Sequence, residues 1–401
     1  MQRPRLELEG REDAGPVLVC VCAQHGNEPS GVLAMERVLE TIRDQQLPLR
    51  GAVVGLPANL AALRNHSRFM EQDLNRMWTA ARVHALTAGL VDDDFLEHLV
   101  AERHEQAQVI QAIDHIATNA AGPVCFLDLH TTSAPSAPFC VMGDSLINRR
   151  FAAHLPVTRI LGLEEVLEGT LPDYLGHLGH AAVGFEAGQH DDPFSIELHE
   201  SAIWLAIAGA GILARREIPD WARHRRTLAD ASLGLPRVVE VRDHHRVHDG
   251  DRFRMEPGFV NFQRIEAGQV LARDRTTTFH CREAGRIFMP LYQALGEDGY
   301  FVVRAVPRGW LAASALLRRL RLDRLLPLLP SVSRSGRLPG TLMVNERRAG
   351  RWTWSMLHLL GFRRGRRIEG RLHAARDLFH LGRESDEPLV SCTNKPLRLP
   401  Q

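Results

Sequence analysis

One short apolar run near the start of the chain, residues 16–23 (PVLVCVCA), constrains the fold most strongly. A strand that is exposed on one face alternates apolar and polar residues, whereas a strand buried on both faces does not. The run therefore predicts a central strand of a sheet that is covered on both sides. The next residues, QHGNEPSG (24–31), place polar side chains at the carboxyl end of this strand.

Further strands are predicted at residues 51–56, 123–129 and 181–186, and helical stretches, for example 93–116, lie between them. This alternation predicts an α/β fold, a mixed central sheet with helices on both faces. The apolar stretch 202–214 is too short to span a bilayer, and we interpret it as a buried helix.

The character of the sequence changes twice, and these changes predict three parts. Residues 1–234 form the α/β domain. Residues 235–310 contain short alternating segments separated by Gly, Pro and Asp, which indicates a smaller β-rich domain. Residues 311–401 form an Arg-rich C-terminal extension, for which we expect mainly helix.

Charge is distributed unevenly along the chain. The whole sequence of 401 residues has a net charge of +1, yet residues 304–383 contain 18 Arg and 4 acidic residues. One interpretation is an appendage that packs on the acidic body or on a sister subunit, which leaves a homo-oligomer possible. The other is a surface for nucleic acid or for an anionic membrane.

The six cysteines show no metal-binding or disulfide spacing, and the polar N-terminus has no apolar core of a signal peptide. We therefore expect a cytoplasmic protein with reduced cysteines.

Candidate metal ligands follow two of the predicted strands. His25 and Glu28 come just after the first strand, and His130 ends the strand at 123–129. The carboxyl ends of parallel strands form the ligand crevice of open α/β sheets. Two imidazoles and one carboxylate leave a fourth position for water on a zinc ion, which predicts one catalytic Zn²⁺ per chain. Asp128 is a candidate to orient one of these metal ligands without binding the metal itself.

A polar segment at residues 68–76 supplies candidate substrate contacts. Asn75 and Arg76 are suited to hold a substrate carboxylate, and Arg68 to stabilise an oxyanion. The alternative is that these arginines form surface ion pairs with Glu71 and Asp73.

Glu186 follows the strand at 181–186 and is a candidate general base and acid. The alternative is a partly buried glutamate that is paired with an arginine. Tyr292 and Tyr300 are candidates to enter the cleft, although a half-buried strand position is the commoner place for a tyrosine.

These residues lie in four segments: HGNEPSG (25–31), RFMEQDLNR (68–76), DLHTTS (128–133) and GFEAG (184–188). Together the segments resemble the succinylglutamate desuccinylase and aspartoacylase family, a branch of the zinc carboxypeptidase-like hydrolases. The resemblance implies a zinc carboxypeptidase-like fold with a smaller C-terminal β domain. It also implies that the zinc ligands are His25, Glu28 and His130, and that Glu186 is the catalytic base and acid. In the same way it implies that Arg68 polarises the carbonyl and that Asn75 and Arg76 bind a carboxylate.

The sequence departs from the family pattern at Gly176, where the pattern has a further carboxylate-binding arginine. Tyr292 is the better match to the tyrosine that closes the family's pocket.

The predicted function is a zinc-dependent amidohydrolase, a deacylase that cleaves the amide bond of a small N-acyl amino acid. A metallocarboxypeptidase-type peptidase is the near alternative, and a β domain that caps the cleft would exclude its long substrates. A non-catalytic protein that uses the basic tail to bind nucleic acid, membrane or a partner is the alternative of another class.

Overall fold

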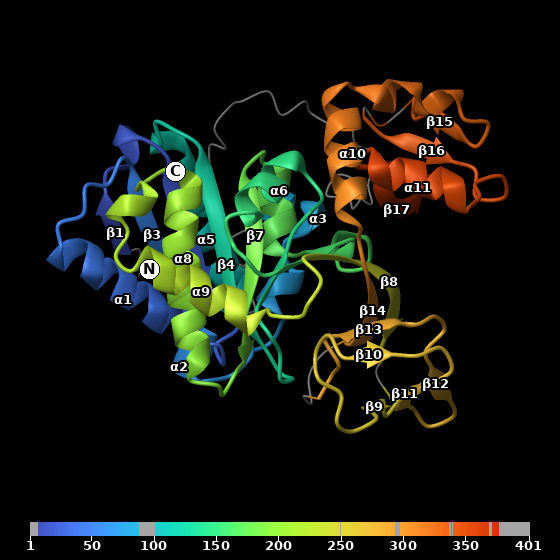
Figure 1. The fold of residues 1–401 in the computed structure, drawn as a ribbon, viewed down its shortest axis with the longest axis horizontal. Coiled ribbons are helices and arrows are strands. Elements are labelled where there is room, and N and C mark those ends of the chain that lie inside the picture. Colours follow the sequence, from blue (N-terminus) through green and yellow to red (C-terminus); the bar gives the residue numbers. More distant parts are fainter. Residues whose placement is uncertain are drawn as a thin grey trace.

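The computed structural model describes residues 7–87, 101–248, 250–292, 297–336, 338, 340–368 and 371–376. An eleven-stranded sheet forms its centre, with the strand order β1-β3-β2-β4-β7-β5-β6-β8-β14-β13-β10 (Figure 1). The strands are β1 (Glu7–Gly10), β2 (Val17–Cys22), β3 (Ala52–Pro57), β4 (Val124–Thr132), β5 (Phe139–Val141), β6 (Thr158–Leu161), β7 (Ala181–Gln189), β8 (Val238–Arg246), β10 (Arg264–Ile265), β13 (Gly285–Phe288) and β14 (Asp298–Ala305).

The four strands predicted from apolar runs are the neighbours β3, β2, β4 and β7, which all run parallel. The outer strand β1 is antiparallel to β3, and β5 is antiparallel to β7, so the sheet is mixed as predicted. The parallel pairing brings the carboxyl ends of β2, β4 and β7 to one edge of the sheet.

Helices cover both faces of this sheet, because the side chains of β2 are apolar on both. One face carries Leu18, Cys20 and Cys22 and packs in one core with α1 (Ser30–Asp44), α6 (Leu146–Ala152) and α8 (Phe194–Ala210), while α9 (Trp221–Ala231) packs on α8. The other face carries Val17, Val19 and Val21 and packs with α3 (Ala80–Thr87), α5 (Ala101–Asn119) and α7 (Leu171–His177). The short helix α2 (Leu60–Arg64) contacts α5.

Two helix predictions have clear outcomes. The stretch 202–214 was expected to be a buried helix, and α8 holds most of it, with its residues from Ser201 to Ile207 all buried. The first part of the helix predicted over 93–116 lies outside the described residues, and the rest belongs to α5. Within the described part of the chain, no helix is both long and apolar enough to cross a membrane.

The β-rich segment contributes to two sheets. Its strands β8, β14, β13 and β10 extend the central sheet, while β9 (Arg254–Met255), β11 (Val270–Arg273) and β12 (Thr278–His280) form a three-stranded sheet. A separate apolar cluster that includes Phe259, Leu271 and Ile287 lies between them. The segment is thus rich in β-strands, as predicted. That a separate domain begins at residue 235 stays a prediction.

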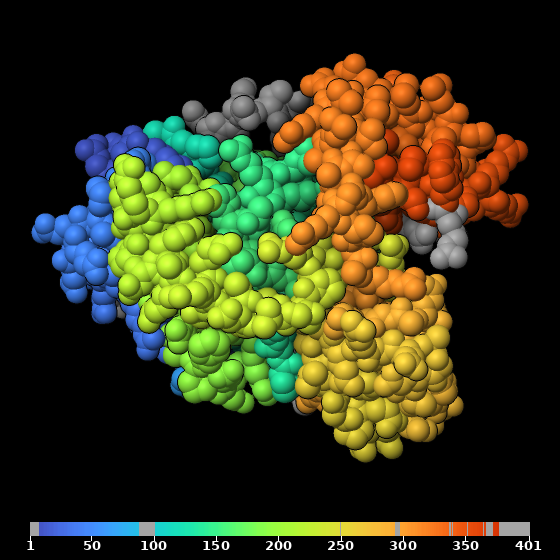
Figure 2. All heavy atoms as spheres, in the orientation of Figure 1, coloured from blue at the N-terminus to red at the C-terminus, as the bar shows by residue number. Residues whose placement is uncertain are grey.

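We use the name C-terminal module for residues 308–376. This part of the chain was expected to be mainly helical, but it is not. It combines the helices α10 (Arg308–Arg319) and α11 (Arg351–Leu359) with a four-stranded sheet in the order β15-β16-β18-β17. These strands are β15 (Val332–Arg334), β16 (Leu342–Val344), β17 (Arg363–Ile368) and β18 (Arg371–Ala375). The module has its own apolar core, and Figure 2 shows it seated against the body of the molecule.

Candidate active site

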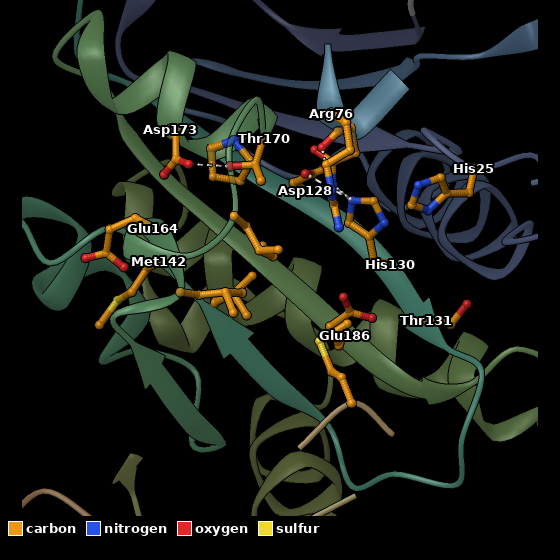
Figure 3. A pocket seen from close by; sticks show the side chains of 18 of the residues that line it. His25, Arg76, Asp128, His130, Thr131, Met142, Glu164, Thr170, Asp173 and Glu186 are labelled. Carbon is orange, nitrogen blue, oxygen red and sulfur yellow. Dashed lines mark hydrogen bonds and ion pairs between the residues drawn. The ribbon is translucent and has the colours of Figure 1, made fainter. Parts of the chain in front are cut away.

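The candidate residues meet at the carboxyl ends of the parallel strands (Figure 3). His25 and Glu28 lie in the loop between β2 and α1, His130 lies in β4, and Glu186 lies in β7. His130 and Glu186 are direct partners in the β4–β7 register. Neighbouring strands therefore bring together residues that are 56 positions apart in the sequence.

Glu28 lies between the two histidines. One carboxylate oxygen is 2.8 Å from His25 Nδ1 and the other is 3.2 Å from His130 Nδ1. Ligand atoms of all three residues lie within 4.8 Å of one another, and all three side chains are buried. Burial opposes ionisation of Glu28, but the two histidines outweigh it and hold the pKa of this carboxyl well below its usual value. Two imidazoles and a carboxylate at this spacing fit the donor set of a hydrolytic zinc site.

The far nitrogen of each imidazole is also held by a carboxylate. His25 Nε2 is 3.0 Å from Asp73 Oδ1, and His130 Nε2 is 3.1 Å from Asp128 Oδ2. Gln24 donates a hydrogen bond of 2.7 Å to Asp128. Such contacts fix the ring orientation of metal-binding histidines, which leaves Nδ1 of both rings to face Glu28.

The segment 68–76, which holds the predicted substrate contacts, is held in place by a buried glutamate of α5. Glu102 of α5 accepts hydrogen bonds from the backbone N–H groups of residues 70, 71 and 72. The backbone N–H of Gly26 donates to the carbonyl of Arg68, which joins this segment to the loop of His25. The two loops are therefore fixed to one another and to α5.

Arg68 lies beside the metal-ligand group. Its Nη2 donates to Asp73 at 2.9 Å, and its Nη1 is 3.8 Å from Glu28. Its Nε is buried and has no hydrogen-bond partner among the described residues. The ion pair with Asp73 that we considered as an alternative is therefore present, and Arg68 still lines the cavity.

Asn75 and Arg76 also line this cavity. The Asn75 side chain accepts from the backbone N–H of Leu171 at 3.0 Å, and its amide nitrogen is 3.5 Å from His130 Nε2. Arg76 does not pair with Glu71. Its guanidinium donates to Asp298 of β14 at 2.9 Å, which ties the central domain to the β-rich segment.

Glu186 is 8% exposed, and its Oε2 has no hydrogen-bond partner in the part of the chain that the structure describes. Burial raises the pKa of this carboxyl to about 8, against the opposing effect of His130. No ion pair of Glu186 with an arginine is found among the described residues. A carboxyl group that exchanges its proton near neutral pH suits acid–base catalysis.

These residues surround a cavity with a volume of about 100 Å³. Much of its remaining wall comes from the loops after β5 and β6 and from the start of α7, and Figure 3 shows Met142, Glu164 and Asp173 on the side away from His25. A larger cavity of about 880 Å³ adjoins it and extends towards the β-rich segment. The two cavities share the lining residues Arg68, Arg76, Thr131, Leu167 and Met289.

The structure does not bring Tyr292 to either cavity, contrary to our prediction. Its hydroxyl donates to the carbonyl of Glu256 and accepts from the backbone N–H of Phe259, so it closes a turn of the β-rich segment. Tyr300 is buried and stacks on His245, which also places it outside both cavities.

His190 lines the larger cavity and was not predicted as a site residue. Its Nδ1 lies 2.7 Å from the hydroxyl of Thr131, while its buried Nε2 is without a hydrogen-bond partner among the residues described. The available signal was its position directly after β7, four residues beyond Glu186.

A buried carboxyl group with a raised pKa, set beside candidate metal ligands at a sheet edge, fits the arrangement of a hydrolase. Comparison with known proteins supports the expected family, because residues 14–202, a little under half of the chain, match the succinylglutamate desuccinylase/aspartoacylase catalytic domain. Members of this family are hydrolases that act on amide bonds.

Individual relatives are distant. The chain is 25% identical to a succinylglutamate desuccinylase of Pseudomonas paraeruginosa over 287 residues, which are 66% of this chain and 76% of the relative. Its fold resembles a succinylglutamate desuccinylase/aspartoacylase from Rhodobacter sphaeroides, with a TM-score of 0.55 at 16% identity, over 75% of this chain and 89% of the other. The succinylglutamate desuccinylase from Chromobacterium violaceum gives a TM-score of 0.51 at 17% identity, with the same coverage.

Proposed function

We propose that this protein is a zinc-dependent amidohydrolase that removes a small acyl group from an N-acyl amino acid. The observation that carries the proposal is the convergence of His25, Glu28 and His130 beside Glu186, whose Oε2 has no hydrogen-bond partner among the described residues. A zinc ion held by the three ligands would polarise the scissile carbonyl and make water a nucleophile near neutral pH.

The residues around the ligands have separable tasks. Glu186 takes a proton from the attacking water and returns it to the leaving nitrogen, for which its raised pKa is suited. Arg68 donates to the oxygen that gains negative charge when the carbonyl is attacked. Arg76, which faces both cavities, binds the carboxylate of the amino acid, and Asn75 places it.

The shape and polarity of the smaller cavity favour a short, uncharged acyl group. On the scale on which one water occupies about 10–15 Å³, a volume of about 100 Å³ admits few heavy atoms. The wall away from His25 includes Met142, Thr170 and the carboxyl groups of Glu164 and Asp173. A second carboxylate on the acyl group would meet this acidic and apolar wall, and among the described residues the cavity lining has no arginine besides Arg68 and Arg76. The same limit on volume disfavours a long peptide.

The proposal is tested by a hydrolysis screen of the zinc-loaded protein on matched N-acetyl and N-succinyl amino acids. We expect release of the free amino acid, with N-acetyl substrates preferred. Hydrolysis of none of these amides, by a preparation that contains one zinc per chain, would contradict the proposed function. A preference for N-succinyl substrates would contradict only the assignment of the acyl group.

A further inference from the structure

We propose that the C-terminal module is a positioning element of the substrate cavity: Arg363 and Arg318 hold in place the two loops that form part of the cavity wall away from His25. We call the contacts of these two arginines with the loops the clamp. The effect of the clamp on substrate rests on the proposed function, whereas the existence of the clamp does not.

Arg363 begins strand β17 and reaches from the module into the central domain. Its Nη2 donates to Asp144 at 2.8 Å, and its Nη1 donates to Glu240 at 2.8 Å and to Glu165 at 3.2 Å. Its Nε is 3.6 Å from Glu164. The side chain is only 3% exposed, so a single buried guanidinium faces four carboxylates that belong to another part of the molecule.

Arg318 of α10 completes the clamp. It donates to both the side chain and the backbone carbonyl of Asp144, at 2.6 Å each. It also donates to the carbonyls of His358 and Leu359 in its own module. Gly361 has a φ of +88°, and a Cβ there would lie 2.6 Å from the Arg318 guanidinium carbon, so the turn after α11 needs glycine to admit this side chain.

The carboxylates held by the two arginines lie in the cavity wall or directly beside it. Asp144 follows the wall residues Met142 and Gly143 in the loop after β5. Glu164 is itself a wall residue in the loop after β6, and its Oε1 accepts from the backbone N–H of Asp144 at 3.2 Å. The arginines therefore hold two loops that also contact one another.

The planar fork of Arg363 gives the clamp its importance for the loops. One of its nitrogens donates to Asp144 and another to Glu165 and Glu240, whereas a single ammonium group in its place cannot hold all three carboxylates. A buried carboxylate that loses its partner is strongly unfavourable, so the loops would move to return it to water. Because the metal ligands lie on β2, β4 and their loops, such a movement would change substrate binding and leave the metal site intact.

The test uses the full chain with the variants Arg363→Lys and Arg318→Lys, which keep the charge and lose the planar fork. Arg334→Ala, an exposed position on β15 of the same module, is the matched control. Four quantities are measured: zinc per chain, KM and kcat on the N-acyl amino acid found in the screen, and hydrogen exchange of the backbone amides of residues 142–145 and 162–167.

We expect both Lys variants to retain one zinc per chain, to raise KM by about tenfold or more with a smaller change in kcat, and to exchange the two loops faster. The control should match the native protein. Unchanged KM and unchanged exchange in both Lys variants would overturn the inference. If Arg363→Lys does not fold, Arg318→Lys decides. If the native protein hydrolyses no amide, the proposed function fails by itself, and the exchange rates still decide whether the clamp exists.

Discussion

Single residues set the chemistry of this site, and Glu186 is the clearest case. Its carboxyl is buried beside His130, and its pKa is raised to about 8 by that burial. A buried carboxyl with an oxygen that lacks a hydrogen-bond partner among the described residues costs stability. The proposed catalytic role would account for this cost, because the oxygen would then be available to the reacting water.

Glu186→Gln keeps the shape of the side chain and removes its proton transfer. We expect kcat to fall by about 10²–10⁴-fold while zinc binding is retained. The assay is steady-state hydrolysis of the N-acyl amino acid, with metal analysis of the same preparation. Glu266→Gln, on the exposed surface of the β-rich segment, is the control and should keep full activity. Full activity in Glu186→Gln would remove the residue from the mechanism.

At this scale the sequence was informative about motif residues and misleading about isolated ones. The meeting of His25, Glu28 and His130 could be predicted because each lies at the carboxyl end of a strand whose burial is visible in its composition. Tyr292 was misplaced because a lone aromatic residue carries no information about the turn that its hydroxyl closes. His190 was missed because a histidine in a polar loop looks the same whether or not a cavity lies beside it.

At the scale of elements, the loop between β2 and α1 is held by close backbone packing. A Cβ on Gly26 would lie 2.0 Å from the carbonyl carbon of Ala62, at α2. This residue stands between two candidate metal ligands, so the approach of α2 fixes where both of them lie.

Gly26→Ala should displace the loop and weaken zinc binding by at least about tenfold, because orientation of the ligands is lost. Titration with a competing chelator measures this affinity. Gly309→Ala in α10 is the control, because a Cβ there meets nothing within 4 Å, and its zinc affinity should be native. Equal affinity in both variants would show that the loop does not depend on Gly26.

The parallel strands could be predicted from composition because apolar runs without alternation have one simple explanation. The strands of the C-terminal module could not. Strand β17 (RRGRRI in its range Arg363–Ile368) has neither an apolar run nor an alternation, because Arg363 is buried by ion pairing and not by apolar contacts. Hydrophobicity patterns cannot predict the burial of a charged side chain by ion pairs.

At the scale of the whole molecule, ion pairs join the module to the body. Burial opposes ionisation of Glu240, but His358 and Arg363 outweigh it and lower the pKa of this carboxyl to about 2, from 4.5. A folded-state pKa below the unfolded value means that the carboxylate stabilises the fold above about pH 4.5. This stabilisation is lost as the pH falls from there through about 2.

Glu240→Gln should therefore lower the free energy of unfolding by about 1–3 kcal/mol at pH 6, and this difference from the native protein should shrink at pH 3. Urea unfolding at the two pH values measures it. Glu283→Gln removes an exposed ion pair with Arg304 and should have little effect at either pH. A difference for Glu240→Gln that grows towards pH 3 would contradict the sign of this account.

The uneven charge of the sequence predicted packing of the basic tail on the acidic body as one of two interpretations, and the contacts of Arg318 and Arg363 agree with it. Which carboxylates they meet could not be predicted, because those lie far away in sequence, at Asp144, Glu164, Glu165 and Glu240. Binding of nucleic acid or membrane by the other arginines of the tail stays a prediction.

The most direct test of the central claim is anomalous X-ray scattering at the zinc absorption edge, from crystals of the zinc-loaded protein. The account predicts one strong peak per chain, about 2.0–2.2 Å from a nitrogen of His25, a nitrogen of His130 and a carboxylate oxygen of Glu28. A map without a peak among these three side chains, from crystals that contain zinc, would contradict it.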